Sequence, residues 1–338
     1  MKTIQNLAGI LLLSVSLNAC AQAQSVHNNM QYNHMVETGN SSNRSVFYAS
    51  NKYITQKLNA KDIKEVNLTS IALRITPTDK NEVSLRLPEN FTQLIQTEVV
   101  NNKLRIRFKN HVEVHYNDIE LFLPYRYLED LRIIGSGSMY LSKELNTNHL
   151  TVSIAGRGSF RAPSLECSQK LSMQVSGSGD ISCTNISTES LEWTVNGSGN
   201  INSSRINSKE CQITVAGSGD ISCSKLQTEK CKISIAGSGD IRVSEIQTEE
   251  LAGSVAGSGD LHLQGKARKA DYHQAGSGTI HAEECATQDV TAKCIGNGEI
   301  YCRAEQTLDC ETDQGGKVFY KGKPQVTTTS NNQPHRIK

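Results

Sequence analysis

A Gly-x-Gly turn recurs about every 20 residues between Gly135 and Gly316, and it is most often written Gly-Ser-Gly-Asp-Ile. The first glycines of the turns lie at positions 135, 156, 177, 197, 217, 237, 257, 276 and 296, and a degraded tenth copy ends at Gly315-Gly316. A short and constant period of this kind is typical of a solenoid, whose coils stack and share one core. The repeat therefore predicts one elongated body in place of the two globular domains that 338 residues would otherwise suggest.

Apolar residues alternate with polar ones on both sides of each turn, which predicts short strands with one face turned inward. They stand six, four and two residues before the first glycine and four, six and nine residues after it. The coil around Gly217 shows the whole pattern: Cys211, Ile213, Val215, Ile221, Cys223 and Leu226. Because parallel crossover connections are almost always right-handed, the sequence predicts an all-β fold, a right-handed parallel β-helix with coils of about 20 residues.

The first 20 residues have the features of a bacterial secretion signal, with one charge at Lys2 and an apolar run from Leu7 to Leu17. The residues Leu17-Asn18-Ala19-Cys20 resemble a lipobox, which would make Cys20 the acylated first residue of an outer-membrane lipoprotein anchored in the membrane by lipid. Ala21-Gln22-Ala23 is a rival small-x-small cleavage site that would release a soluble protein. Residues 21–45 are polar without a period, which predicts a disordered tether.

Residues 46–134 read as short alternating strands without a Gly-x-Gly turn, so they are either degenerate first coils or a β-rich cap. The pair Asn101-Asn102 predicts a hairpin turn within this segment. The repeat β-helix is expected over residues 135–322, and the polar residues 323–338 are expected to form a disordered tail. The formal net charge of +1 provides no electrostatic attraction to a polyanion, so no nucleic-acid partner is expected.

The ten cysteines could be a disulfide framework, but their register favours another interpretation. Apart from Cys20 and Cys167, they stand where other coils place apolar residues, so we interpret them as small buried hydrophobes. Cys211 and Cys231 fall in adjacent coils at a distance that would permit a bridge. Cys167 falls at a corner position and is expected to be the most exposed. No Cys-x-x-Cys pair supports a zinc or thioredoxin-like site.

An aspartate follows the second glycine of several turns, and stacking would align these residues in one column: Asp180, Asp220, Asp240 and Asp260. Such a carboxylate ladder could bind calcium, as in nonapeptide β-rolls. The alternative is that these aspartates are turn formers, because Asp and Asn satisfy local backbone groups at corners. The repeat of 20 residues lacks the second half of the nonapeptide and favours the turn-forming alternative, so neither a metal nor another cofactor is expected.

One outward column combines side chains that bind ligands: Arg242, His262, His281 and Tyr301, each five residues after its glycine. We take this column as the candidate ligand site. A second candidate is the strand with His111, Glu113 and His115 on one face, which could hold a metal. For both sets the competing interpretation is a solvated strand face without a ligand.

An enzymatic β-helix needs a concave site, which known carbohydrate-active members build from long loops between the coils. Here the coils keep to 18–21 residues without an insertion. A smooth rod of this kind has nowhere to form a cleft unless the segment before Gly135 supplies one. The sequence therefore predicts a protein that is not an enzyme.

The segment from Leu128 to Gly137, Leu-x-x-Leu-x-Ile-x-Gly-Ser-Gly, followed by tandem Gly-Ser-Gly-Asp-Ile coils, resembles the family named putative auto-transporter adhesin, head GIN domain. The resemblance covers about residues 45–322 and implies a right-handed β-helix in an envelope protein of the type common in Bacteroidetes. It brings no active site with it. The chain departs from the pattern at Arg157, at the inward Gln274 and in the register around Gly315.

These observations favour a non-catalytic lipoprotein of the cell envelope, an adhesin or a module that binds a glycan or a protein through the outward columns of its rod. A purely structural spacer is the first alternative. A carbohydrate-active enzyme is the second.

Overall fold

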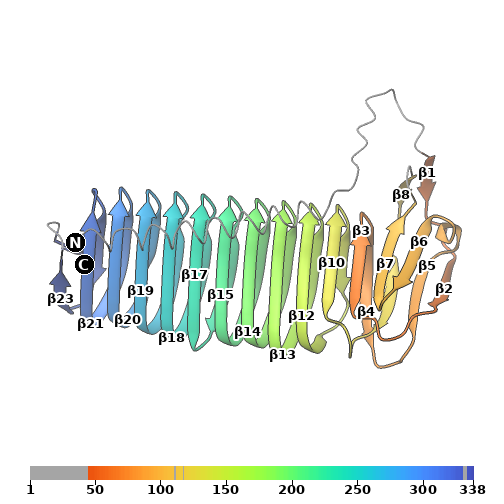
Figure 1. The fold of residues 1–338 in the computed structure, drawn as a ribbon, viewed down its shortest axis with the longest axis horizontal. Helices are drawn as coiled ribbons and strands as arrows, with labels where there is room; N and C mark the ends of the chain where they lie inside the picture. The colour runs from red at the N-terminus through yellow and green to blue at the C-terminus, as the bar shows by residue number, and fades with distance from the viewer. Residues whose placement is uncertain (1–44, 110–111, 117, 330–332) are drawn as a thin grey trace, which may run out of the picture.

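The computed structural model describes residues 45–109, 112–116, 118–329 and 333–338, and it shows a long rod of stacked β-coils (Figure 1). The only helix among these residues is one 3-10 turn, η1 (Glu89–Phe91). No helix in the described residues is long and apolar enough to cross a membrane. The predictions for the signal segment, Cys20 and residues 21–44 of the tether lie outside the described residues.

The body of the rod is a parallel β-helix, as the repeat predicts, and each strand pairs with its equivalent in the next coil. Its strands are β10 (Asp130–Gly135), β11 (Ser138–Leu141), β12 (Leu145–Gly156), β13 (Ser159–Gly177), β14 (Asp180–Gly197), β15 (Asn200–Gly217), β16 (Ile221–Gln227), β17 (Lys230–Gly237), β18 (Ile241–Gly257), β19 (Leu261–Gly276), β20 (Thr279–Gly296) and β21 (Glu299–Asp313). Between β14 and β15 the register is one to one, with Gly197 and Gly217 at equivalent positions of their coils.

The first glycine of each turn is required by the close approach of the coils. Gly177 has φ +128°, and a Cβ built on it would lie 2.5 Å from the carbonyl oxygen of Gly156 in the preceding coil. The same approach lets the N–H of Ser178 donate a hydrogen bond of 2.9 Å to that carbonyl. A side chain would clash with the bond that joins the coils, so the repeat keeps a glycine here.

The core is one continuous cluster that runs from the first coils to Val318, and it contains the inward columns read from the sequence. Trp193, Phe160 and Tyr272 are its largest buried side chains in the body of the rod. Burying one such side chain contributes roughly 1.5–3 kcal/mol, and in a solenoid every coil repeats that contribution. The inward Gln274 is 1% exposed, and its Nε2 donates a hydrogen bond of 2.6 Å to the carbonyl of Gly278, so the turn satisfies the amide nitrogen, whereas Oε1 is buried without a hydrogen-bond partner.

The nine cysteines of the described residues are buried and none forms a disulfide. Cys211 and Cys231 lie side by side in β15 and β17 with free thiols, so the bridge that their spacing permits is not formed. The expectation that Cys167 is exposed is wrong, because this residue is 1% exposed. Its corner column points inward: in the later coil Thr228 occupies the same column, and its hydroxyl donates a hydrogen bond of 2.9 Å to the carbonyl of Lys209.

The N-terminal segment combines the two alternatives left open by the sequence, because it contains both coils and a cap. Its strands are β1 (Ser45–Tyr48), β2 (Tyr53–Leu58), β3 (Glu65–Thr69), β4 (Ala72–Thr78), β5 (Val83–Pro88), β6 (Ile95–Val100), β7 (Lys103–Phe108), β8 (Val112–His115) and β9 (Glu120–Pro124). β3 and β4 pair in parallel with β10 and β11 on one side and with β7 and β9 on the other, so the first coil in sequence is the second in the stack.

Antiparallel strands close this end of the rod (Figure 1). β6 pairs with β7 through the predicted turn at Asn101-Asn102, where both residues have positive φ, and β5 pairs with β9 and with β2. β1 and β8 form a separate two-stranded parallel pair. Antiparallel β6 and β5 occupy the outer edges of β7 and β9, so these two edges are not open to another coil.

The C-terminal residues continue the stack. β22 (Lys317–Lys321) and β23 (Gln325–Thr328) pair in parallel with β21, and β24 (His335–Arg336) pairs with β22. The prediction of a disordered tail from residue 323 onward is therefore wrong for these strands. Their sequence is polar because a final strand has little apolar core left to cover.

Candidate functional site

The aspartate column forms a ladder of hydrogen bonds between coils. Asp220 Oδ1 accepts a hydrogen bond of 2.8 Å from the N–H of Asp240, and Asp240 Oδ1 accepts one of 2.8 Å from the N–H of Asp260. Asn200, at the same place one coil before Asp220, does the same with its amide oxygen. These bonds explain the column as a backbone cap, which is the turn-forming alternative. One oxygen of each aspartate on the ladder has this role, and calcium binding by Asp180, Asp220, Asp240 and Asp260 stays a hypothesis.

The predicted outward column is present, and it continues further than predicted as a stack of aromatic rings. We call the five rings of His262, His281, Tyr301, Phe319 and His335 the aromatic column. Their consecutive centroids are 4.6, 5.4, 4.7 and 5.6 Å apart, and the first three pairs lie within 12° of parallel. Each stacked pair contributes about 0.5–1.5 kcal/mol beyond the area it buries, so the aromatic column also stabilises the final coils.

Arg242 stands in register with His262 at the head of the aromatic column. The pKa of His262 is lowered, mainly by partial burial and then by the charges of His281 and Arg242, which favours its neutral form. Further along, the hydroxyl of Tyr301 donates a hydrogen bond of 2.7 Å to Glu299 Oε2, and this bond raises the pKa of Tyr301 to about 12. The same bond, together with Lys317, lowers the pKa of Glu299.

The stacking of the rings determines which of their atoms are accessible to a ligand. The ring faces cover one another, so the solvent meets the ring edges, with the imidazole nitrogens and the Tyr301 hydroxyl. Sequence reasoning placed Arg242, His262, His281 and Tyr301 in this column but missed Phe319 and His335, which follow the degraded last turn. That the column binds a ligand stays a prediction.

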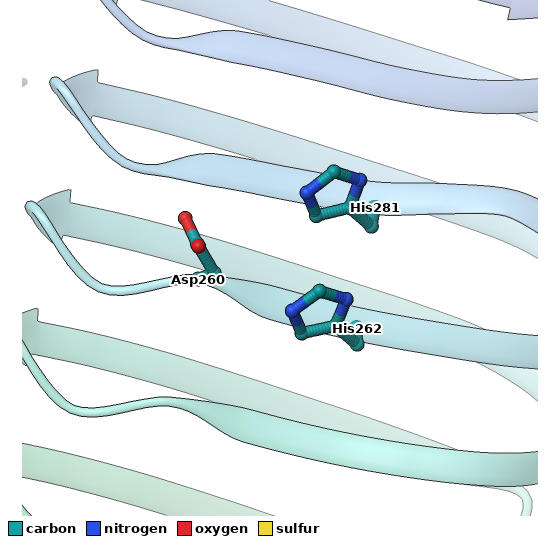
Figure 2. Close-up of side chains that lie close together, drawn as sticks. All are labelled: Asp260, His262 and His281. Carbon is teal, nitrogen blue, oxygen red and sulfur yellow. The ribbon is translucent and has the colours of Figure 1, made fainter.

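Two rings of the aromatic column meet a carboxylate at the turn. Figure 2 shows Asp260 beside the stacked His262 and His281, with one nitrogen of each ring on the aspartate side. One ligand atom from each of these three half-buried side chains lies within 4.8 Å of the other two. Among the residues that the structure describes, this is the one set of three or more ligand-type side chains so close together.

The second histidine candidate is partly outside the described residues, because His111 is not described. His115 Nε2 lies 3.6 Å from Glu113 Oε1, and both side chains are half exposed. The ring of His115 stacks on Tyr48 of β1 at 4.9 Å. Metal binding by this strand, like the competing interpretation of a solvated strand face, stays a hypothesis.

A groove runs along the body of the rod, contrary to the expectation of a smooth surface without a concave site. We call it the long groove; its volume is 790 Å³ and it crosses seven coils, from Lys170 to Asp289. Its two walls are columns of outward side chains, which stand seven and five residues before the first glycine of each turn. Its floor is the nearly buried column between them: Leu191, Cys211, Cys231, Leu251 and Ala270.

Charges of both signs line the walls of the long groove in nearly equal number. The cations are Lys170, Lys230, Lys232 and Lys269, and the anions are Glu192, Glu210, Glu250, Asp271 and Asp289. Lys170 pairs with Glu192 at 2.8 Å, whereas Glu210, Lys230 and Glu250 form no ion pair with any described residue. Sequence reasoning missed this groove because it looked for loop insertions. The available signal was the small side chains, Cys and Ala, between two charged columns.

The architecture is that of a β-solenoid with open, solvent-facing grooves and columns. The chain belongs to the family described as putative auto-transporter adhesin, head GIN domain, whose model matches residues 62–224 and 219–324. Membership of an adhesin-type family indicates an exported protein of the cell envelope. No curated protein matches the sequence.

One solved structure shares the fold, and others are similar over most of the chain. A putative adhesin from Bacteroides fragilis is 22% identical with a TM-score of 0.52, and the match covers 70% of this chain and 99% of the other. A putative lipid binding protein from Parabacteroides distasonis (18% identity, TM-score 0.37) is matched over 87% of this chain and 100% of its own. A putative adhesin from Parabacteroides merdae (17%, 0.36) is matched over the same shares. At such identities the first likeness shows the fold alone.

Proposed function

We propose that this protein is a non-catalytic, adhesin-type module of the cell envelope that binds an extended glycan strand along the long groove. The observation that carries the proposal is the groove itself, a continuous open channel of 790 Å³ across seven coils. Membership of an adhesin-type family supports a binding role without chemistry.

The shape of the long groove suits a linear polymer. Six steps of about 4.8 Å between strands make it about 29 Å long. A volume of 790 Å³ spread over that length leaves a shallow, narrow channel, which matches a single extended strand better than a compact ligand. Small-molecule sites instead surround most of the surface of their ligand.

The charges of the long groove favour a neutral, hydroxyl-rich polymer. Cations and anions alternate along the column from Glu210 through Lys230 and Glu250 to Lys269, so a polyanion or a polycation would meet repulsion at every second coil. Sugar hydroxyls, by contrast, both donate and accept hydrogen bonds. They can therefore bind carboxylates and ammonium groups in turn.

The outward column of Arg242, His262, His281 and Tyr301 is a second contact surface in this proposal. Its ring edges and the guanidinium offer hydrogen-bond donors at the spacing of the coils. Lipid attachment at Cys20 would hold the rod at the outer membrane. Mass spectrometry of the mature N-terminus tests that attachment, and a mature chain that begins after Ala23 would contradict it.

The central experiment is a glycan array with the mature protein and two matched tryptophan variants. Ala252→Trp places a large ring in the wall of the long groove, between Lys232 and Asp271, and should abolish binding. Asn185→Trp places the same ring at an exposed position outside the groove and outside the outward column, between Ser164 and Arg205, and should leave binding unchanged.

Other outcomes separate the alternatives. Binding that survives Ala252→Trp but is lost when the four residues of the outward column become alanine would move the site to that column. If the protein bound another protein but no glycan, the ligand would be a protein and the glycan proposal would be wrong. Release of new reducing ends from a bound polysaccharide would show an enzyme, and no binding at all would favour the structural spacer.

A further inference from the structure

The cluster of Asp260, His262 and His281 has the composition of a transition-metal site. Two imidazoles and one carboxylate suit zinc, copper, nickel or iron, whereas calcium prefers oxygen ligands alone. One ligand atom of each residue lies within 4.8 Å of the other two. Ligand atoms around a tetrahedral zinc ion are about 3.4 Å apart, given metal–ligand distances near 2.1 Å, so small side-chain rotations would complete the geometry.

The three side chains are already held in place. Asp260 Oδ1 accepts a hydrogen bond of 2.8 Å from the N–H of Thr279, which fixes the carboxylate and leaves its other oxygen available. The rings of His262 and His281 are 4.6 Å apart and within 4° of parallel, and Tyr301 supports the far side of His281. Ligands that are ordered before the metal arrives lose little conformational freedom on binding.

A second carboxylate lies beside one of the two imidazoles. Glu283 Oε1 lies 3.7 Å from Nδ1 of His281, so Nε2 is the nitrogen free for a metal. Glu283 Oε2 is buried and has no hydrogen-bond partner in the structure. Metal-binding histidines commonly direct their other ring nitrogen to such a carboxylate, which fixes the tautomer and strengthens the ligand.

From these observations we infer that Asp260, His262 and His281 form a binding site for a divalent transition-metal ion, with zinc as the first choice. Three protein ligands leave at least one coordination position open towards the solvent, where water or a donor group of a bound molecule completes the shell. The inference does not rest on glycan binding, because the metal alone tests it, although His262 and His281 also belong to the second contact surface of the proposed function.

The test is isothermal titration of zinc chloride into the tag-free full chain after removal of metal by a chelator. The chain itself supplies substitutions that keep the fold. Asp260→Asn copies Asn200, whose amide oxygen makes the same bond to the next coil. His262→Asn introduces the residue that Asn202 already is in the same column of an earlier coil. His281→Asn makes the same change in the coil after His262.

We expect one zinc ion per chain at the site, and a loss of affinity of more than tenfold in each of the three variants. Glu283→Gln should weaken binding by about 10–100-fold, the usual effect of losing an outer-shell carboxylate. The matched control is His273→Asn: His273 Nε2 also has a carboxylate neighbour, Asp271 at 2.9 Å, and its loss should leave zinc binding unchanged.

Cobalt provides an independent readout, since its visible absorption bands report coordination by nitrogen and oxygen ligands and should disappear in His281→Asn. Zinc binding that is equal in wild type and in the double variant of His262 and His281 would overturn the inference. Failure to bind zinc at millimolar concentration by a correctly folded wild type would do the same. Unchanged circular dichroism and urea midpoints of the metal-free variants exclude misfolding as the cause of a loss.

Discussion

Asp220 accepts through Oδ1 a hydrogen bond of 2.8 Å from the backbone N–H of Asp240, one coil further along the rod. The same bond links Asp240 to Asp260 and Asp260 to Thr279. The repeated aspartate thus joins neighbouring coils at the turn, where the backbone carbonyls of the glycines already accept from other N–H groups. At the turn, the carboxylate of the aspartate accepts the hydrogen bond from the backbone N–H of the next coil, whereas in the strands a backbone carbonyl accepts it.

Two substitutions of Asp220 should show whether its hydrogen bond or its negative charge stabilises the rod. Asp220→Ala should lower the free energy of unfolding by roughly 1 kcal/mol, because the N–H of Asp240 loses its acceptor. Asp220→Asn should cost much less, since Asn200 makes an equivalent bond to Asp220 itself. Urea unfolding of the two variants measures the difference. Equal losses in both would show that the carboxylate charge, and not the acceptor, is what matters.

The buried thiols should be inert in the folded protein. Burial raises the pKa of Cys167 to about 12 and that of Cys183 to about 12, so hardly any reactive thiolate forms near neutral pH. A thiol reagent at pH 8 should modify none of the nine described cysteines within minutes, and all nine after denaturation. Rapid labelling of Cys167, identified by peptide mapping, would contradict its buried position.

The parallel β-helix could be predicted because one strong signal, the Gly-x-Gly turn, marks the same point of every coil. The order of the first coils could not, since β7 and β9 precede β3 and β4 in the stack but follow them in the chain. Alternation of apolar residues reports which face of a strand is buried, and it does not report which neighbour the strand chooses. Val326 illustrates the problem at the other end, where β23 pairs with β21 although that strand has no apolar face to recognise.

The candidate site was predictable only where the register is regular. Counting from the glycines placed His262, His281 and Tyr301 in one column, but Phe319 follows the degraded turn at Gly315, so the same count missed it. Cys167 was misjudged because threonines and serines fill its column elsewhere, and polar residues suggest exposure. Their hydroxyls in fact bind carbonyls at the inward corner, as Thr248 does with Glu229 at 3.0 Å.

The carboxyl group of Asp130 should give the stability of the rod a pH dependence. Burial raises its pKa above the usual 3.8, although Arg132 at 2.8 Å opposes the change. A raised folded-state pKa means that the stabilising contribution of this group is fully present below the unfolded pKa and is lost as pH rises through the folded pKa. Asp130→Asn cannot titrate. The free energy of unfolding of wild type minus that of the variant should therefore fall as the pH is raised from 3.5 to about 6, and a constant difference in urea unfolding would contradict this.

The C-terminal strands should protect the end of the rod from other molecules. Removal of residues 323–338 takes away β23 and β24 and exposes the edges of β21 and β22, so we expect lower stability and association of molecules in light scattering. Removal of residues 333–338 alone takes away only the two-residue strand β24 and should have a smaller effect. A monomer of unchanged stability after the larger deletion would show that the edge needs no cover.

The one-to-one register between β14 and β15, and between β15 and β17, has a consequence for how such proteins evolve. A duplication of one whole coil would insert a unit whose two sides already match its neighbours, so the rod would grow by about 4.8 Å without a change of fold. Each added coil would also extend the long groove by one more set of wall residues. The length of the rod can therefore change in equal steps through duplication or loss of single coils, while the two ends, which are built differently, stay unchanged.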